Sequence, residues 1–270
     1  RIKDTEVEAL QERLLTDDDK EPVDLTHKVL VRIFTNNSFK EGGRFYRGWW
    51  QNVSSELRPF ITINSKETQE YDYSQLSPNM IYSRYNHELG SEDAYSRVLG
   101  PEHRDEVKQA FNAMFQANTS LESKPKGINL NNIEMTWKEL KQAILNAHKP
   151  IKDLFFTGLG NELQFEDSII AENVMLQFAR MDYPALPVHD SFIMYHTFGN
   201  NGELEEAIRR AFHDRFHKDI GVSRELVDRV VNNFTINKSQ EVNVNPGDLV
   251  NKKSDYFLWK AREDMWMSRK

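Results

Sequence analysis

The chain has 270 residues, of which 39% are hydrophobic and 11% aromatic, so it can bury a sizeable core and disorder is not expected. It has no cysteine, which excludes disulfides, thiolate zinc sites and cysteine nucleophiles and fits a reducing cytoplasm. It also has no apolar run of membrane-spanning length, so we expect a cytoplasmic protein without a membrane partner. The net charge of −7 argues mildly against nucleic-acid binding, because phosphate contacts require Lys and Arg, although the clustering of charges matters more than their sum.

The N-terminal part of the chain, residues 1–42, is expected to be mainly helical, with an amphipathic helix over 4–15. Residues 24–34 are apolar and allow either a helix or a strand, and the Asn- and Gly-rich stretch after them predicts a loop. Residues 59–73 predict two short strands with a turn at Asn64.

Beyond these strands, helical periodicity recurs between short breaks. It predicts helices over residues 78–88, 101–117, 137–150 and 161–181. Thr136 and Glu139 fit a capping box at the start of the third helix. Residues 186–195 predict a strand, a polar turn and a second strand, and helices are expected over 203–218 and 223–234. Short strands surrounded by helices, without βαβ alternation, predict an α+β fold with a small antiparallel sheet.

Asp72 ends the second predicted strand, shortly before a helix begins. An acid in this place can bind a cation, and the carbonyl of Tyr73 offers a second hard oxygen ligand of the kind that Mg²⁺ prefers. The alternative is that Asp72 only caps the following helix.

Asp190 lies in the turn of the predicted hairpin, next to His189 and Ser191. An ordinary Asx turn is one interpretation of this acid. A hydrolytic Ser-His-Asp arrangement is a poorer one, because adjacent residues of a strand point to opposite faces.

Together, the two acids match a requirement of two-metal phosphoryl transfer, in which carboxylates bridge two ions roughly 3.5–4 Å apart. We therefore predict that Asp72 and Asp190 meet at a site for two Mg²⁺ ions, with Mn²⁺ as an alternative metal.

Arg104, Lys108, Phe111 and Phe115 fall at i, i+4, i+7 and i+11 of one predicted helix and share a face. Two cations suit a triphosphate, and two aromatic rings suit stacking on a base or sugar. The alternative is an amphipathic helix with its Phe residues in the core and its cations at the edge.

Three stretches, in this order, resemble the palm and fingers motifs of family A DNA polymerases and of single-subunit phage-type RNA polymerases. They are Asp72-Tyr-Ser-Gln75, Arg104-x3-Lys108-x2-Phe111-Asn112-x2-Phe115 and Val188-His-Asp190. The resemblance implies a template-directed nucleotidyltransferase, DNA polymerase or primase-like, of bacterial, phage or mobile-element origin. It divides one domain of 1–270 into a palm (43–75 and 160–200), reduced helical fingers (76–150) and a C-terminal helical region (201–270).

The resemblance also assigns roles to individual residues. It implies metal ligation by Asp72, Tyr73 and Asp190, and catalysis by both acids with Lys108 as general acid. It implies nucleotide binding by Arg104, Lys108, Phe111, Asn112, Phe115, Gln75 and Ser77, and template or primer contacts by Arg44, Arg58 and His189. Position alone, at the start of the long helix before the hairpin, predicts a further template or primer contact by Gln164. The implied partners are a nucleic-acid template and primer, nucleoside triphosphates, and another replication protein that supplies a thumb or clamp.

The chain departs from the family pattern at two points. Phe111 comes one position earlier than the usual spacing, which puts the stacking residue in doubt. Ser77 stands where DNA polymerases of this family carry a Glu that excludes the ribose 2′-hydroxyl, so relaxed sugar selectivity is expected.

Two other functions remain open from the sequence. A catalytically degenerate palm would bind nucleic acid or a partner without chemistry, as the acidic charge and short length allow. A metal-dependent nuclease would require a third acid, for which Glu70 is a candidate because it shares a strand face with Asp72.

Overall fold

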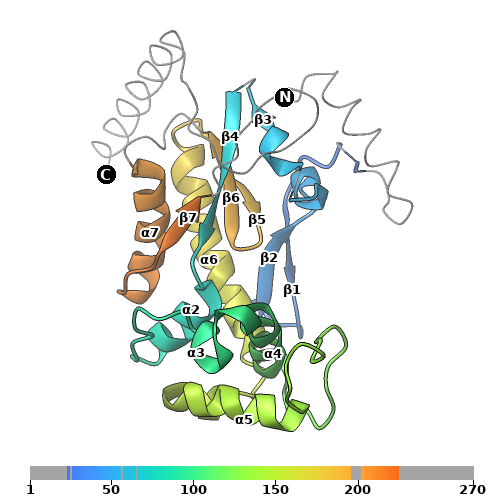
Figure 1. Ribbon diagram of the computed structural model, residues 1–270. Helices are drawn as coiled ribbons and strands as arrows, with labels where there is room; N and C mark the ends of the chain where they lie inside the picture. The colour runs from blue at the N-terminus through green and yellow to red at the C-terminus, as the bar shows by residue number, and fades with distance from the viewer. Residues whose placement is uncertain (1–22, 25, 56, 65, 196–201, 225–270) are drawn as a thin grey trace.

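The structure is a computed structural model that describes residues 23–224 except 25, 56, 65 and 196–201. The helix predicted over 4–15 lies outside the described residues, as does the part of the 223–234 helix beyond residue 224. Figure 1 shows strands backed by two helices at one end of the molecule and a group of helices at the other. The predicted α+β class with small antiparallel sheets is confirmed.

The strands form two sheets. β1 (Val31–Phe34) and β2 (Gly42–Tyr46) make an antiparallel ribbon. The larger sheet has the order β3-β4-β6-β5, with β7 also paired to β4. Its strands are β3 (Thr62–Ile63), β4 (Lys66–Tyr73), β5 (Leu186–Val188), β6 (Ser191–Tyr195) and β7 (Val222–Arg224).

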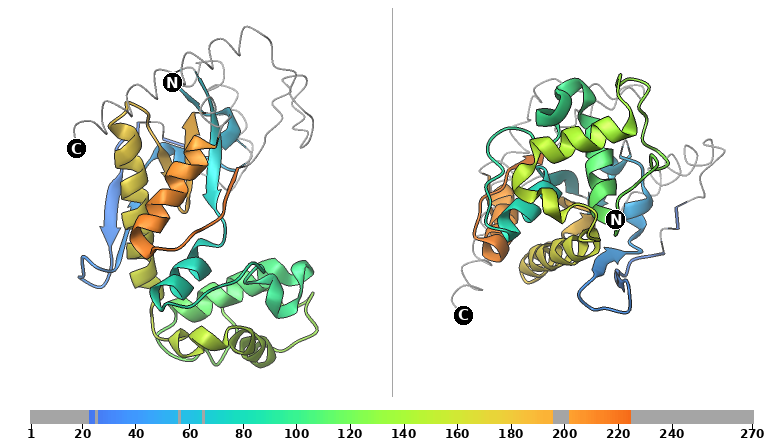
Figure 2. Two further views of the ribbon diagram at one scale, coloured as in Figure 1. Left: turned by 90° about the vertical axis from the view of Figure 1, so that its left-hand side faces the viewer. Right: turned by 90° about the horizontal axis from the view of Figure 1, so that it is seen from below.

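Six α-helices surround these strands. They are α2 (Leu76–Arg84), α3 (Ser96–Leu99), α4 (Arg104–Gln116), α5 (Trp137–Ala147), α6 (Gly160–Ala179) and α7 (Glu203–Phe216) in the described part of the chain. The two views of Figure 2 show α2 to α5 grouped at one end, while α6 and α7 lie against the sheet. None of the helices in this described part is both long and apolar enough to cross a membrane.

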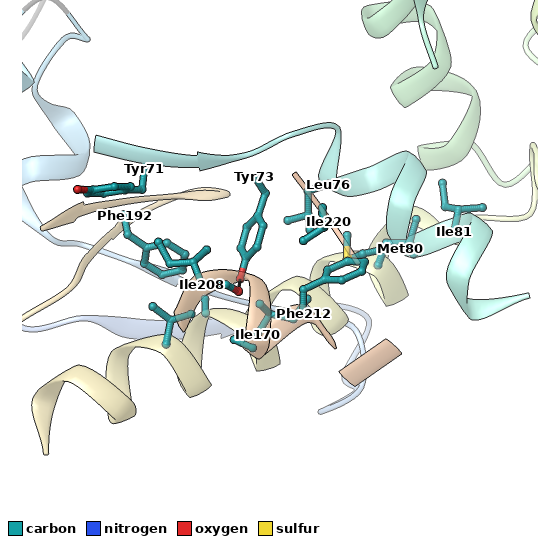
Figure 3. Packing of buried hydrophobic residues seen from close by; sticks show 14 of the residues in the cluster. Tyr71, Tyr73, Leu76, Met80, Ile81, Ile170, Phe192, Ile208, Phe212 and Ile220 are labelled. Atoms are coloured by element: carbon teal, nitrogen blue, oxygen red, sulfur yellow. Dashed lines mark hydrogen bonds between the residues drawn. The ribbon is translucent and has the colours of Figure 1, made fainter. Parts of the chain in front are cut away.

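The large sheet has one apolar face and one partly polar face, because successive side chains of β4 and β6 point to opposite faces of the sheet. Tyr71, Tyr73 and Phe192 are buried and point toward α6 and α7 (Figure 3). The hydroxyl of Tyr73 donates a hydrogen bond to the carbonyl of Ile208 on α7 at 2.5 Å, so burial of this ring leaves no orphaned polar atom. Burial of each large ring stabilises the fold by about 1.5–3 kcal/mol, and it fixes which β4 residues face the other way.

A second apolar cluster covers the far end of the opposite face. It consists of Trp50, Val53, Ile61, Val188 and Ile193. The indole of Trp50 donates to the carbonyl of Pro187 at 3.0 Å, so the buried ring also has its polar atom paired. This face is therefore closed at one end and left open where β4 ends.

Several element boundaries differ from the sequence prediction. Residues 31–34 are a strand, one of the two forms that the sequence allowed for 24–34, because β2 supplies a hydrogen-bonding partner. Residues 222–224 are a strand for the same reason, paired with β4, where a helix was predicted to begin. The helix expected over 78–88 starts and ends earlier, and the one expected over 101–117 opens with a 3₁₀ turn. The capping box of Thr136 and Glu139 is confirmed.

His148, directly after α5, links this helix to α2 and to the segment before α3. It is fully buried, its Nε2 donates to the carbonyl of Ala94, and its Nδ1 accepts from the hydroxyl of Tyr82, both at 3.0 Å. This pairing requires a neutral ring. Burial, followed by the charge of Arg97, lowers the pKa of His148 to about 4.

This pKa predicts that His148 makes an acid-sensitive contribution to the stability of the fold. Because the folded-state pKa lies below the unfolded value, the stabilisation is fully present above pH 6.5 and is lost as the pH falls toward 4. We expect a loss of about 2 kcal/mol over that window. In chemical denaturation at stepped pH, His148→Gln should remove this slope, whereas His87→Gln, at an exposed position, should keep it. An unchanged slope in His148→Gln would contradict the assignment.

Candidate active site

The pairing of β4 with β6 brings the two predicted acids together. Asp72 lies opposite Ser191 in the antiparallel register, so Asp190, the residue before Ser191, sits at the end of β4. The amide of Tyr73 donates to the carbonyl of Asp190 at 3.4 Å. Asp72 and Asp190 both line one cavity of about 650 Å³. Acids separated by over a hundred residues in sequence thus share one wall.

The hairpin tip adopts a backbone conformation that is unusual for its residue. His189 has φ = 55°, in the left-handed region, which is uncommon for residues other than Gly. This bend reverses the chain between β5 and β6 and presents both His189 and Asp190 to the cavity. Strained backbone of this kind persists where the surrounding structure fixes it and is frequent at functional sites.

The cavity holds excess negative charge at Asp72. This side chain is exposed to the cavity, yet neighbouring atoms remove part of its hydration. That desolvation, followed by the charges of Asp190 and Glu70, raises the pKa of Asp72 to about 7, while Lys108 lowers it. A bound cation would relieve the same repulsion.

The opposite wall of the cavity is α4. Arg104, Lys108 and Asn112 line the cavity from positions i, i+4 and i+8 of this helix. The Nε and Nη2 of Arg104 both donate to Oδ2 of Asp93 at 3.1 Å, and its guanidinium lies 5.3 Å from the centre of the Tyr95 ring. Arg104 is therefore held at the cavity edge before any ligand is bound.

Phe111 and Phe115 do not line this cavity, which corrects the expectation that they stack on a base. Phe111 is fully buried and packs edge-on against Tyr95 and Phe155 with ring centres 5.5 and 5.3 Å apart. Phe115 is 3% exposed and borders only a smaller neighbouring cavity. The row of i+4 positions inclines across the helix surface, so Asn112 continues toward the cavity while the rings turn into the core.

Most of the remaining predicted residues line the large cavity, a smaller neighbouring cavity, or both. Ser77 and Gln75 line the large cavity, although Oε1 of Gln75 also accepts from the amide of Ala94 at 2.5 Å. Arg44, Ser77 and Asn112 also border the neighbouring cavity of about 150 Å³, together with Gln164.

Arg58 does not line the large cavity, so its predicted contact with nucleic acid has no support from this cavity. Its Nη1 pairs with Glu70 at 3.2 Å, and Glu70 also accepts from the hydroxyl of Ser191. Arg58 thus binds Glu70, which lies on the same face of β4 as Asp72.

Several residues of the site region escaped sequence analysis. Asp93, Tyr95 and Ser223 line the cavity, and Asp167 lies behind it, bound to Arg44. Ser223 pairs with Asp72 across β4 and β7, a neighbour that no local pattern indicates. Asp167 was detectable in principle, because it belongs to a polar triplet, 166–168, inside an otherwise apolar stretch of α6.

The comparisons with known proteins add little beyond the fold. No family model matches the chain, and no curated protein matches its sequence. One solved structure with a similar arrangement is the POL domain of Pol1 from M. smegmatis in complex with DNA primer-template and dNTP. It shares 14% sequence identity at a TM-score of 0.45, and the match covers 82% of this chain and 50% of that one. The chain therefore spans about half the length of that structure, and a likeness this weak assigns neither a family nor an activity.

Proposed function

We propose that the protein is a template-directed nucleotidyltransferase that adds nucleotides to a primer or starting nucleotide. One observation carries the proposal: β4 and the β5–β6 turn present Asp72 and Asp190 to a cavity whose opposite wall presents Arg104 and Lys108. Acids on one side and cations on the other suit a ligand that has both a metal-binding and a phosphate-bearing part.

The cavity suits a nucleoside triphosphate. Its volume of about 650 Å³ falls in the range typical of small-molecule and cofactor sites. Arg104 and Lys108 lie one turn apart on α4, where they can bind adjacent phosphates. Asn112, one turn further along, and Ser77 line both this cavity and the smaller one, which supports their proposed contacts with the sugar and base.

The donor set at the acids fits a hard divalent cation. Two carboxylates and the carbonyl of Tyr73 supply oxygen ligands, and in the described residues they are not joined by a third His, Asp or Glu in metal-binding geometry. Mg²⁺ commonly takes one or two carboxylates and completes its shell with water and substrate phosphate. When bound, such ions activate the attacking hydroxyl and neutralise the charge that develops on the triphosphate.

The chain's own residues bind and orient the reactants. Asp72 and Asp190 hold the cation end of the ligand, and Arg104 fixes the phosphates from the side that Asp93 supports. Lys108 lines the same cavity as Asp72 and is the proposed general acid that protonates the leaving pyrophosphate. His189, at the hairpin tip, lines the cavity and is the proposed contact with the primer terminus. Most of the rate enhancement would come from this positioning.

Template and primer strands are the proposed macromolecular partners, with Arg44 and Gln164 as contacts at the smaller cavity. A second replication protein that supplies a thumb or clamp belongs to the same proposal. The nuclease alternative is weaker, because Glu70, its third acid, is already bound by Arg58 and Ser191. The binding-module alternative predicts nucleotide binding without incorporation, so extension of a labelled primer–template separates it from catalysis.

Asp72→Asn should separate activity from stability. Loss of the metal-binding charge should reduce Mg²⁺-dependent primer extension by about 100-fold or more. Because desolvation and neighbouring acids raise the folded-state pKa to about 7, ionised Asp72 destabilises the fold above that pH. The melting temperature of Asp72→Asn at pH 8 without divalent ions should therefore equal or exceed that of the wild type. Asp153→Asn, at an exposed position distant from the cavity, is the matched control and should change neither measurement. Retained incorporation in Asp72→Asn would refute the role of this acid.

Ser77 should set sugar selectivity. With a small side chain at this position, ribonucleotides should be incorporated alongside deoxynucleotides, and Ser77→Glu should lower the ribo-to-deoxy ratio of kcat/KM by about tenfold or more through steric exclusion. Ser77→Ala should leave the ratio near the wild-type value. Strict use of deoxynucleotides by the wild type would defeat this hypothesis.

The proposal that Asn112, and not Phe111, contacts the nucleotide is also testable. Asn112→Ala should raise the KM for the triphosphate with little loss of stability, because Asn112 is only half-buried. Phe111→Ala should lower the free energy of unfolding by about 3–4 kcal/mol, as truncation of a buried ring does. A KM effect for Phe111→Ala at unchanged stability would restore the original assignment.

A further inference from the structure

Three consecutive polar residues of α6 are buried, and each is held by an arginine from a different element. Glu166 binds Arg215 of α7 through two hydrogen bonds of 2.5 and 2.9 Å. Asp167 accepts from Nε of Arg44 of β2 at 2.5 Å. Ser168 accepts from Nη2 of Arg32 of β1 at 2.8 Å, and Nη1 of Arg32 also pairs with Glu172 at 3.0 Å. Consecutive helix positions point about 100° apart, so α6 is tied to its neighbours in three directions.

Only one of these three contacts faces the cavity. Arg44 lines both the large and the small cavity, whereas neither Arg32 nor Arg215 lines either of them. The Asp167 side chain is 4% exposed and that of Arg44 is 26% exposed. Arg44 is thus held at Nε by a buried acid, while the side chain remains partly exposed at the cavity.

The backbone of β2 is built for this contact. Gly43, the residue before Arg44, has φ = +78°, and a Cβ at this position would lie 2.9 Å from the Phe34 ring and 3.2 Å from the hydroxyl of Ser168. Absence of a side chain therefore lets β2 approach α6 closely enough for Arg44 to reach Asp167.

Arg44 lies within the electrostatic reach of two acids. The charges of Asp167 and Asp190 both raise the pKa of Arg44, with Asp167 the larger of the two. Burial raises the pKa of Asp167 to about 6 against the opposing effect of Arg44. The ion pair that Arg44 makes is nevertheless with Asp167 and not with Asp190. Arg44 and Asp190 line the same cavity, and the hydrogen bond between Nε and Asp167 holds the guanidinium at the buried acid.

We propose that Asp167 is a positioning residue for the cation site: by binding Nε of Arg44, it keeps this guanidinium from pairing with Asp190 and leaves the Asp190 carboxylate free for a divalent cation. This inference rests on the proposed function of the acids. Without the Asp167 charge, Arg44 would turn toward Asp190 and compete with the metal. The outer nitrogens of Arg44, fixed in direction, remain available to acceptor atoms of the nucleic acid.

The test is direct binding of Mn²⁺, followed by electron paramagnetic resonance of the free ion, together with the Mg²⁺ dependence of primer extension. Asp167→Asn should weaken Mn²⁺ binding by about tenfold, the lower end of what loss of an outer-shell partner of a metal ligand costs. It should raise the half-saturating Mg²⁺ concentration by a similar factor, so the loss of activity should be larger at limiting than at saturating Mg²⁺. Arg44→Ala should not weaken Mn²⁺ binding, because no cation remains to compete.

The opposite effects of these two substitutions distinguish positioning from simple support of the fold, which would weaken binding in both variants. Glu166→Gln, at the adjacent buried acid that is paired away from the cavity, is the matched control and should stay within about twofold of the wild type. If Asp167→Asn does not fold, Arg44→Lys decides, because a lysine lacks the Nε anchor and should weaken Mn²⁺ binding where Arg44→Ala does not. Wild-type Mn²⁺ affinity in Asp167→Asn, or equal weakening in Asp167→Asn and Arg44→Ala, would overturn the inference. Failure of the wild type itself to bind Mn²⁺ would instead refute the proposed function and this inference with it.

Discussion

The site depends on the antiparallel register between β4 and β6. Pairing of Asp72 with Ser191 places Asp190 at the end of β4, and a slip of one residue would turn Asp72 toward the apolar face that α6 and α7 cover. Burial of Tyr71, Tyr73 and Phe192 on that face makes such a slip costly. The core therefore selects the register, and the register assembles the two acids.

Bringing acids together opposes folding, and the surrounding residues limit the cost. The negative charges of Asp190 and Glu70 both act on Asp72, but Arg58 and Ser191 bind Glu70. Lys108, across the cavity, partly offsets the charge of Asp72. What remains is a local excess of negative charge that faces an open volume, which is the electrostatic condition for binding a cation.

α6 connects this cavity to the rest of the molecule. Its buried polar triplet binds arginines of β1, β2 and α7, so both the ribbon and α7 are anchored to α6. A buried acid is costly unless it is paired, so the sequence must supply Arg44 once Asp167 is inside. The same constraint fixes the direction of a cation at the cavity wall, and in this way a contact that supports the fold also shapes the site.

The sequence alone determined the α+β class, the hairpin at 186–195, the capping box of α5 and the two acids, because strand alternation, turn residues and capping are local properties. The tertiary structure decided the rest. β1 and β7 became strands because distant partners supplied their hydrogen bonds, and Phe111 entered the core because Tyr95 and Phe155 surround it. Arg58 forms an ion pair with Glu70, and Asp167 forms one with Arg44 from a distant part of the chain. Periodicity states which face of a helix is apolar or polar, but what lies opposite that face is set only by packing of the whole chain.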